Sequence, residues 1–253
     1  MVNLKGRTAL IAGASSGIGA GFARLLASAG AGVVLGARRL NRTTELANEI
    51  ENAGGQALAV SLDVTDEASV IAAYDAAEAR FGTVNSVVAN AGVGVGGRST
   101  DMPYDGLRQV IDTNLVGAYL VSREGARRMI AAGSRDKEDG RIVLIGSITA
   151  MQNGTGDAAY AATKAGLAHL GRQFAKEWVR QGVNVNTLQP GWIPTEINDD
   201  WFASERGKAE IEELHRRRLL DHDALDDMLL YLLSDRSRQI TGSTFTIDDG
   251  QSL

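Results

Sequence analysis

The stretch Ala9-Leu10-Ile11-Ala12-Gly13-Ala14-Ser15-Ser16-Gly17-Ile18-Gly19 joins a short apolar run to three closely spaced glycines. The run over 8–11 contains β-branched residues and is long enough for a buried strand. Beyond the glycines, apolar residues recur at helical spacing at Phe22, Ala23, Leu25 and Leu26. The stretch therefore predicts a strand, a tight glycine turn and a helix.

A glycine turn that leads into a helix is suited to binding an anion. The first turn of a helix presents unpaired backbone N–H groups and the positive end of the helix dipole. Glycines let a bulky group approach that backbone, so a nucleotide pyrophosphate is the expected ligand. The spacing over 13–19 is G-x-x-x-G-x-G, not the general G-x-G-x-x-G of dinucleotide sites. An ordinary glycine-rich turn would look the same, so the rest of the chain must decide.

The composition of the 253 residues is that of an ordinary globular chain, 44% hydrophobic and 23% charged. A net charge of -5 argues against nucleic acid as the main partner. The chain has no cysteine, and His215 and His222 lack partners at a zinc spacing, so we expect no metal. No segment is long and apolar enough to span a membrane, and residues 1–7 hold no apolar signal core. We therefore expect a cytoplasmic protein that binds neither nucleic acid nor membranes.

Strand and helix patterns alternate along the chain. Further strands are expected at 33–35, 57–62, 84–89, 142–145, 183–188 and 244–247. Helices are expected at 43–53, 104–129, 158–180 and over most of 196–233. Another is expected to be capped by Thr65-Asp66 and to run to about Phe81-Gly82. Such alternation predicts right-handed βαβ units and a parallel sheet with helices on both faces. We expect one doubly wound, Rossmann-type α/β domain over 1–253, with its ligand at the carboxyl ends of the strands.

Polar residues and glycines follow the predicted strands at that edge. They are the glycine turn, Gly36-Ala37-Arg38-Arg39, Asp63-Val64, Asn90-Ala91-Gly92, Ser147 and Pro190-Gly191. Packing alone gives no reason to favour this edge, so the clustering supports a nucleotide site.

The second strand indicates which nucleotide is bound. An NAD site usually has an acidic side chain there that bonds the ribose 2′-hydroxyl, and this chain has Ala37. Arg38 and Arg39 follow, and the forked donors of arginine suit a 2′-phosphate. We predict a preference for NADP(H), with NAD(H) possible. The alternative is a pair of solvated surface arginines at the start of a helix.

Tyr160 and Lys164 are four residues apart in a predicted helix and therefore share a face. A free tyrosine has a pKa near ~10, and a neighbouring ammonium favours the phenolate. Such a pair can act as a general acid or base toward a carbonyl or alcohol oxygen. The spacing alone is common in amphipathic helices, so its position just after the fifth predicted strand carries the argument.

Together these motifs resemble the short-chain dehydrogenase/reductase family, in its compact single-domain branch, and most nearly the 3-oxoacyl-carrier-protein reductases and related carbonyl reductases. The matching residues follow the family order and cover nearly the whole chain: Gly13, Gly17, Ile18, Gly19, Asp63, Val64, Asn90, Ala91, Gly92, Asn114, Ser147, Tyr160, Lys164, Pro190 and Gly191. Two positions depart from the family pattern. Ala12 replaces a threonine, and Asp248-Asp249-Gly250 replaces Asp-Gly-Gly.

The resemblance implies a catalytic role for Asn114, Ser147, Tyr160 and Lys164. Tyr160 would donate a proton during reduction, and Lys164 would lower its pKa and bond the nicotinamide ribose. Ser147 would hold the substrate oxygen, and Asn114 would hold a water that links Lys164 to solvent. The coenzyme-binding residues so implied are Gly13, Ser15, Ser16, Gly17, Ile18, Gly19, Arg38, Arg39, Asp63, Val64, Asn90, Ala91, Gly92, Tyr160, Lys164, Pro190, Gly191, Ile193 and Thr195.

The resemblance also implies a substrate lid over about 195–220 and a homotetramer, or a homodimer, built on the helix that carries Tyr160 and the long helix before it. We interpret the chain as an NADPH-preferring oxidoreductase that transfers hydride between nicotinamide and a small-molecule carbonyl or secondary alcohol. One alternative is an NAD-linked alcohol, polyol or steroid dehydrogenase that works oxidatively. Another is a non-catalytic nucleotide-sensing protein, against which the four intact catalytic positions argue.

Overall fold

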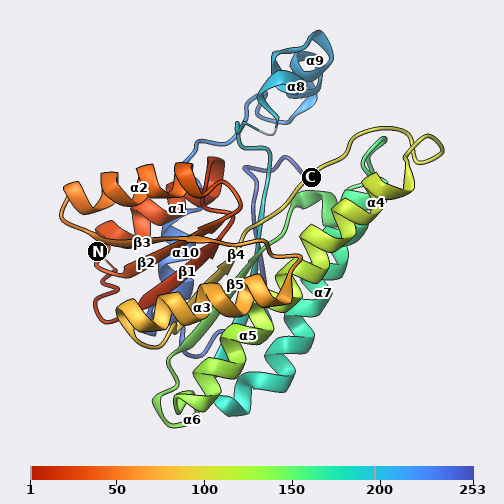
Figure 1. The fold of residues 1–253 in the computed structure, drawn as a ribbon. Helices are drawn as coiled ribbons and strands as arrows, with labels where there is room; N and C mark the ends of the chain where they lie inside the picture. Colours follow the sequence, from red (N-terminus) through yellow and green to blue (C-terminus); the bar gives the residue numbers. More distant parts are fainter. Residues whose placement is uncertain (1, 197) are drawn as a thin grey trace.

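Seven parallel strands form one sheet through the centre of the molecule (Figure 1). The computed structural model describes residues 2–196 and 198–253, and its strands lie in the order β3-β2-β1-β4-β5-β6-β7. In chain order the strands are β1 (Thr8–Ala12), β2 (Gly32–Ala37), β3 (Gln56–Ser61), β4 (Ser86–Ala89), β5 (Gly140–Ile145), β6 (Val183–Pro190) and β7 (Thr244–Ile247). Because every pairing is parallel, all carboxyl ends lie at one edge. The chain reverses its winding direction between β1 and β4, which is where doubly wound sheets bind ligands.

Helices cover both faces of this sheet, as predicted (Figure 1). The α-helices are α1 (Gly17–Ser28), α2 (Leu40–Asn52), α3 (Glu67–Phe81), α4 (Tyr104–Ile111), α5 (Ala118–Ala131), α6 (Ser134–Lys137), α7 (Ala158–Trp178), α8 (Asp199–Ala203), α9 (Glu205–Glu213) and α10 (Asp226–Leu233). A π-helical segment, η1 (Asp112–Gly117), joins α4 to α5, and the short 3-10 helices are η2 (Ile148–Ala150), η3 (Val179–Gln181) and η4 (Asp235–Ser237). The core clusters place α1, α2 and α10 on one face and α3, α5 and α7 on the other.

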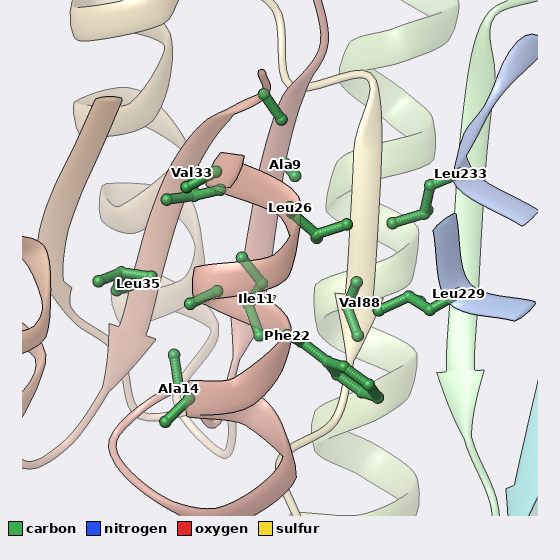
Figure 2. Close-up of a cluster of buried hydrophobic side chains, with 14 of the residues drawn as sticks. Ala9, Ile11, Ala14, Phe22, Leu26, Val33, Leu35, Val88, Leu229 and Leu233 are labelled. Atoms are coloured by element: carbon green, nitrogen blue, oxygen red, sulfur yellow. The ribbon is translucent and has the colours of Figure 1, made fainter. Parts of the chain in front are cut away.

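The alternation of side chains along the strands divides the core into these two layers. In β1, Ile11 packs toward α1 and α10, whereas Leu10 packs toward α3 and α5. Figure 2 shows the first layer, where Phe22 of α1 and Leu229 of α10 meet the strands. Burying each large apolar side chain stabilises the fold by about 1.5–3 kcal/mol. A sheet buried on both faces explains why its strands are almost continuously apolar.

The predicted elements are found, with boundaries that shift by a few residues. Asp66 is the residue that caps α3, because its side chain accepts a hydrogen bond from the Ala68 N–H at 2.9 Å. Thr65 does not cap the helix and instead donates its hydroxyl proton to Asp63. The long helix expected over 104–129 is continuous only because the π-helical segment η1 lies inside it.

The expectation that most of 196–233 is helical is met by α8, α9 and α10, but the helices are interrupted in the middle of this region. Residues 214–225 separate α9 from α10 and form turns. Arg217 has a φ of 50°, and the Leu220 N–H bonds the Trp192 carbonyl at 2.9 Å. This tertiary bond, with the buried side chain of Leu225, draws the segment back onto the core and interrupts the helical pattern.

The helices α8 and α9 project beyond the carboxyl edge of the sheet (Figure 1). Both helices lie within the segment predicted as a lid. Residue 197 of that segment and residue 1 of the predicted domain are outside the described residues. The ring of Phe202 packs edge-on against Trp192, with centroids 5.7 Å apart. In the part of the chain that the structure describes, no helix combines the length and the apolar character needed to cross a membrane.

Candidate active site

The glycine turn between β1 and α1 leaves no room for a side chain at Gly13 or Gly19. Gly13 and Gly17 have φ values of 84° and 52°, in the left-handed region that favours glycine. A Cβ on Gly19 would lie well inside contact distance of the Gly13 carbonyl oxygen. Asn90, just after β4, donates from Nδ2 to that carbonyl at 3.0 Å and so ties the turn to the next strand. The turn presents bare backbone to the crevice.

The start of α1 fits an anion. Ser16 occupies the N-cap position but makes no side-chain cap hydrogen bond, so the hydroxyl leaves the N–H groups of the first turn to another acceptor. The positive end of the helix dipole adds to their attraction for a negative charge. A pyrophosphate therefore fits this turn both sterically and electrostatically.

Two arginines lie beside the turn where the second strand ends. The guanidinium group of Arg39 donates to the hydroxyl oxygens of Ser15 at 2.9 Å and Ser16 at 2.7 Å. Arg38 is exposed. The pKa of Asp63 is lowered, mainly by hydrogen bonds from Thr65 and to a smaller extent by the charge of Arg38. These groups surround the adenosine side of the crevice that the fold predicts.

The predicted catalytic hydroxyls meet at the carboxyl end of β5. Ser147 follows this strand, and its Oγ accepts hydrogen bonds from the Thr149 N–H at 3.2 Å and the Thr149 hydroxyl at 2.9 Å. Tyr160 lies in the first turn of α7, where the Ser147 hydroxyl acts to lower the pKa of its phenol. Because the Ser147 oxygen accepts hydrogen bonds from Thr149, the Ser147 hydroxyl can donate its own proton toward the crevice.

Lys164 lies one helical turn beyond Tyr160. Its Nζ donates to the Ile145 carbonyl at 2.8 Å and is 5.4 Å from the centroid of the Tyr160 ring. Burial lowers the pKa of Lys164 to about 8, because a buried ammonium has lost its hydration.

The pKa of Tyr160 is raised, contrary to the lowering that the resemblance implied. Burial of the phenol is the main cause, the hydrogen bond with Ser147 opposes it, and the charge of Asp157 adds to it. The ammonium of Lys164 is directed at the Ile145 carbonyl, and its charge does not outweigh the effect of burial on the Tyr160 pKa. The phenol is consequently protonated at neutral pH, which is the form that a proton donor requires.

Asn114 lies in the π-helical segment, as such functional residues often do. Its amide bonds both backbone groups of Val93, with Oδ1 accepting from the N–H at 2.8 Å and Nδ2 donating to the carbonyl at 2.9 Å. A Cβ on Gly92 would lie 3.5 Å from Asn114 Oδ1 and 3.7 Å from Lys164 Nζ. Asn114 therefore fixes the loop after β4 beside Lys164.

The segment after β6 closes the other side of the crevice. Pro190 ends the strand, Ile193 is buried, and the Thr195 side chain lies 3.5 Å from a Cβ built on Gly17. The structure thus brings the predicted residues to one edge, with two exceptions in orientation. Val64 points into the core, and Gly191 is backed by Gln251 and Asp248, so only their backbones can face a ligand.

Further residues join the site without having been predicted. Arg42 forms an ion pair with Glu196, and its position three residues after Arg39, near the start of a predicted helix, was the only signal. Gln251 accepts a hydrogen bond from the Trp192 N–H at 2.6 Å and has no signal in the sequence. Among residues 2–196 and 198–253, no cluster of three or more His, Cys, Asp or Glu side chains is arranged to hold a metal ion.

Comparisons with known proteins agree with this geometry. The family model for short chain dehydrogenases matches residues 7–206. Oxidoreductase UcpA of Escherichia coli (strain K12) is 36% identical, over 100% of this chain and 97% of that protein. The 3-oxoacyl-[acyl-carrier-protein] reductase FabG of the same organism is 31% identical over 100% of both chains.

Among solved structures, a gluconate 5-dehydrogenase from Burkholderia cenocepacia in complex with NADP and tartrate superposes with a TM-score of 0.93 at 31% identity, over 99% of this chain and 97% of that one. A family match over most of the chain, full-length relatives and a common sheet with helices on both faces all agree. The chain belongs to the short-chain dehydrogenase/reductase family, whose members are oxidoreductases that act on alcohol and ketone groups.

Proposed function

We propose that the protein transfers hydride between NADP(H) and the carbon of a carbonyl or secondary alcohol, with Tyr160 as the general acid or base. The observation that carries this proposal is the buried Tyr160 phenol, whose pKa the Ser147 hydroxyl lowers and which lies one helical turn from the buried ammonium of Lys164. A carbonyl oxygen held by both hydroxyls would be polarised and next to a proton donor.

Each residue has a distinct task in the reductive direction. Tyr160 gives its proton to the oxygen as negative charge develops there, and its raised pKa keeps that proton available at neutral pH. Lys164 then stabilises the resulting phenolate through its positive charge. Ser147, oriented by Thr149, holds the oxygen in place. The nicotinamide, when bound, supplies or accepts the hydride.

The coenzyme would lie along the carboxyl edge of the sheet, with its pyrophosphate at the start of α1. Asp63 would bond the adenine, and Arg38 and Arg39 would bind a 2′-phosphate. The remaining contacts would come from Gly13, Ser15, Ser16, Gly17, Ile18, Gly19, Val64, Asn90, Ala91, Gly92, Tyr160, Lys164, Pro190, Gly191, Ile193 and Thr195. Support for NADP(H) comes from the position of Arg39 on the hydroxyls of the glycine turn and from the NADP bound in the gluconate 5-dehydrogenase.

The reaction is tested by following the absorbance of reduced nicotinamide. Diketones, 3-ketoesters and acyl thioesters are supplied with NADPH or NADH, and secondary alcohols with the oxidised coenzymes. Faster oxidation of NADPH than of NADH is the expected result. Saturable coenzyme binding with no turnover of any ketone or alcohol would overturn the proposal and favour a nucleotide-sensing protein.

The coenzyme preference is tested with Arg38→Asp, because a carboxylate beside the ribose repels a 2′-phosphate and can bond a 2′-hydroxyl. The ratio of Michaelis constants for NADPH and NADH should reverse in favour of NADH. Arg80→Asp, which makes the same charge change on α3, should leave the ratio as in the wild type. An unchanged ratio in Arg38→Asp would contradict the assignment.

An oxidative role on a polyol or sugar acid is a second candidate. The observation in its favour is the structural likeness to a gluconate 5-dehydrogenase. The catalytic residues serve both directions, since oxidation needs the same tyrosine as a base. Turnover of polyol acids with NAD⁺ that exceeds ketone reduction with NADPH would establish this reading.

We also propose that the protein forms a homodimer or homotetramer and that residues 195–220 act as a substrate lid. In support of the assembly, Val116 and Tyr119 expose 41% and 40% of their surface beside an apolar hollow between η1, α5 and α7. A second copy would remove these side chains from water. Light scattering should give a dimer or tetramer mass, and Val116→Glu should lower it. A monomeric wild type would contradict the assembly.

A further inference from the structure

The carboxylate of Glu196 bridges the two sides of the proposed coenzyme crevice. Arg42, in the first turn of α2, donates from Nη1 to both Glu196 oxygens, at 2.8 and 2.9 Å. Arg39 Nη1 lies 3.6 Å from Glu196 Oε2 while the same guanidinium group holds the hydroxyls of Ser15 and Ser16. One acidic side chain therefore engages two arginines next to the glycine turn.

The local structure fixes Glu196 in this position. Its neighbour Thr195 bonds Asn198 Oδ1 through its N–H at 2.7 Å and its hydroxyl at 3.1 Å, and Asn198 Nδ2 donates to the Ile193 carbonyl at 2.9 Å. Thr195 also faces Gly17 of the glycine turn. Hydrogen bonds among Ile193, Thr195 and Asn198 thus hold the backbone beside Glu196 next to the glycine turn, and the Glu196 side chain reaches Arg42 of α2.

The same guanidinium groups suit a carboxylate or a phosphate, because both ligands accept paired hydrogen bonds. Arg42 lowers the pKa of Glu196, so the carboxylate is ionised at neutral pH. A phosphate on the ribose 2′-oxygen would find Arg42 already paired with Glu196, and it would be repelled by the negative charge of Glu196. A 2′-hydroxyl carries no charge and would meet neither obstacle.

We propose that Glu196 is a coenzyme-specificity residue, whose carboxylate competes with the 2′-phosphate of NADP(H) for Arg39 and Arg42 and leaves NAD(H) unaffected. This inference rests on the proposed function. It adds a residue that opposes the arginines and limits the preference for NADP(H).

The competition is modest in size because the three side chains are about half exposed, at 48% for Arg39, 44% for Arg42 and 55% for Glu196. Exposed ion pairs of this kind alter an equilibrium by about two- to five-fold. Salt screens them further, so the effect should shrink above physiological ionic strength.

The test is equilibrium binding of NADPH and NADH, followed by coenzyme fluorescence, to the full-length protein and its Glu196→Gln variant. The amide keeps the size of the side chain and removes its charge. The dissociation constant for NADPH should fall about two- to five-fold while that for NADH stays constant. Glu51→Gln makes the same charge change at the far end of α2 and should alter neither constant. Displacement of NADH by 2′,5′-ADP should improve in Glu196→Gln by the same factor, whereas displacement by 5′-ADP should not.

Three results would overturn the inference. They are an equal change for both coenzymes, weaker NADPH binding in Glu196→Gln, and constants that do not change. A wild-type protein that binds neither NADPH nor NADH would instead refute the proposed function, and this inference with it. Binding of both coenzymes with no selective effect of Glu196→Gln would refute the inference alone.

Discussion

Lys164→Met should change how the stability of the protein depends on pH. The Lys164 side chain is only 4% exposed, and burial lowers its pKa to about 8 from an ordinary 10.5. Among the described residues, its ammonium has one hydrogen-bond acceptor, the Ile145 carbonyl. The difference between the two pKa values corresponds to about 3 kcal/mol of folding free energy.

The direction follows from where the proton is held. Below pH 8 the lysine is charged in both the folded and the unfolded chain, and the folded state bears the full desolvation cost. Between pH 8 and 10.5 the folded chain releases the proton and the unfolded chain keeps it, so stability rises with pH. Methionine has no proton to release. The wild type should therefore gain about 3 kcal/mol relative to Lys164→Met, most of it between pH 8 and 10.5.

The assay is urea unfolding at several pH values from 7 to 10.5, at one protein concentration. Running the pair in a Tyr160→Phe background removes the coupled titration of the phenol. Lys176→Met is the matched control, because Lys176 is an exposed lysine on the same helix. Its difference from the wild type should stay constant with pH. A constant difference for Lys164→Met, or one of opposite sign, would refute the burial of this charge.

Two further predictions concern the glycine turn and the reaction. Gly19→Ala should destabilise the fold by about 1–3 kcal/mol and abolish coenzyme binding, because the new Cβ would collide with the Gly13 carbonyl. Gly21→Ala is the control, since a Cβ at that position meets open space. Coenzyme binding by Gly19→Ala with wild-type affinity would contradict the geometry. The kcat/KM for carbonyl reduction should fall above about pH 8, because Lys164 loses its charge there while Tyr160 stays protonated. A pH–rate profile that is level to pH 10 would contradict the role of the Lys164 charge in the reaction.

The fold could be predicted because its determinants are local. Each strand is a short apolar run, each helix has its own spacing, and the glycine turn directly follows the first strand. The segment 214–225 could not be predicted, because its course depends on the bond between Leu220 and Trp192, which are distant in sequence. Local pattern favoured a helix there, and tertiary contacts prevailed.

The residues of the site could also be predicted only where local spacing reveals them. A spacing of four in a helix was enough to place Tyr160 and Lys164 on one face. The direction of the Tyr160 pKa was not predictable, because it depends on how deeply the fold buries the phenol. The pairing of Arg42 with Glu196 joins residues 154 positions apart, and no periodicity in the sequence reports such a contact.

The most direct test of the central claim compares Tyr160→Phe with the wild type in NADPH-dependent ketone reduction and in NADPH binding. This substitution removes one hydroxyl, and Tyr231→Phe on α10 serves as the control for that loss outside the site. We expect Tyr160→Phe to bind NADPH with nearly wild-type affinity and to lose at least about 100-fold in kcat, the usual contribution of a positioned proton donor. Wild-type turnover by Tyr160→Phe would contradict the assignment of Tyr160 as the acid.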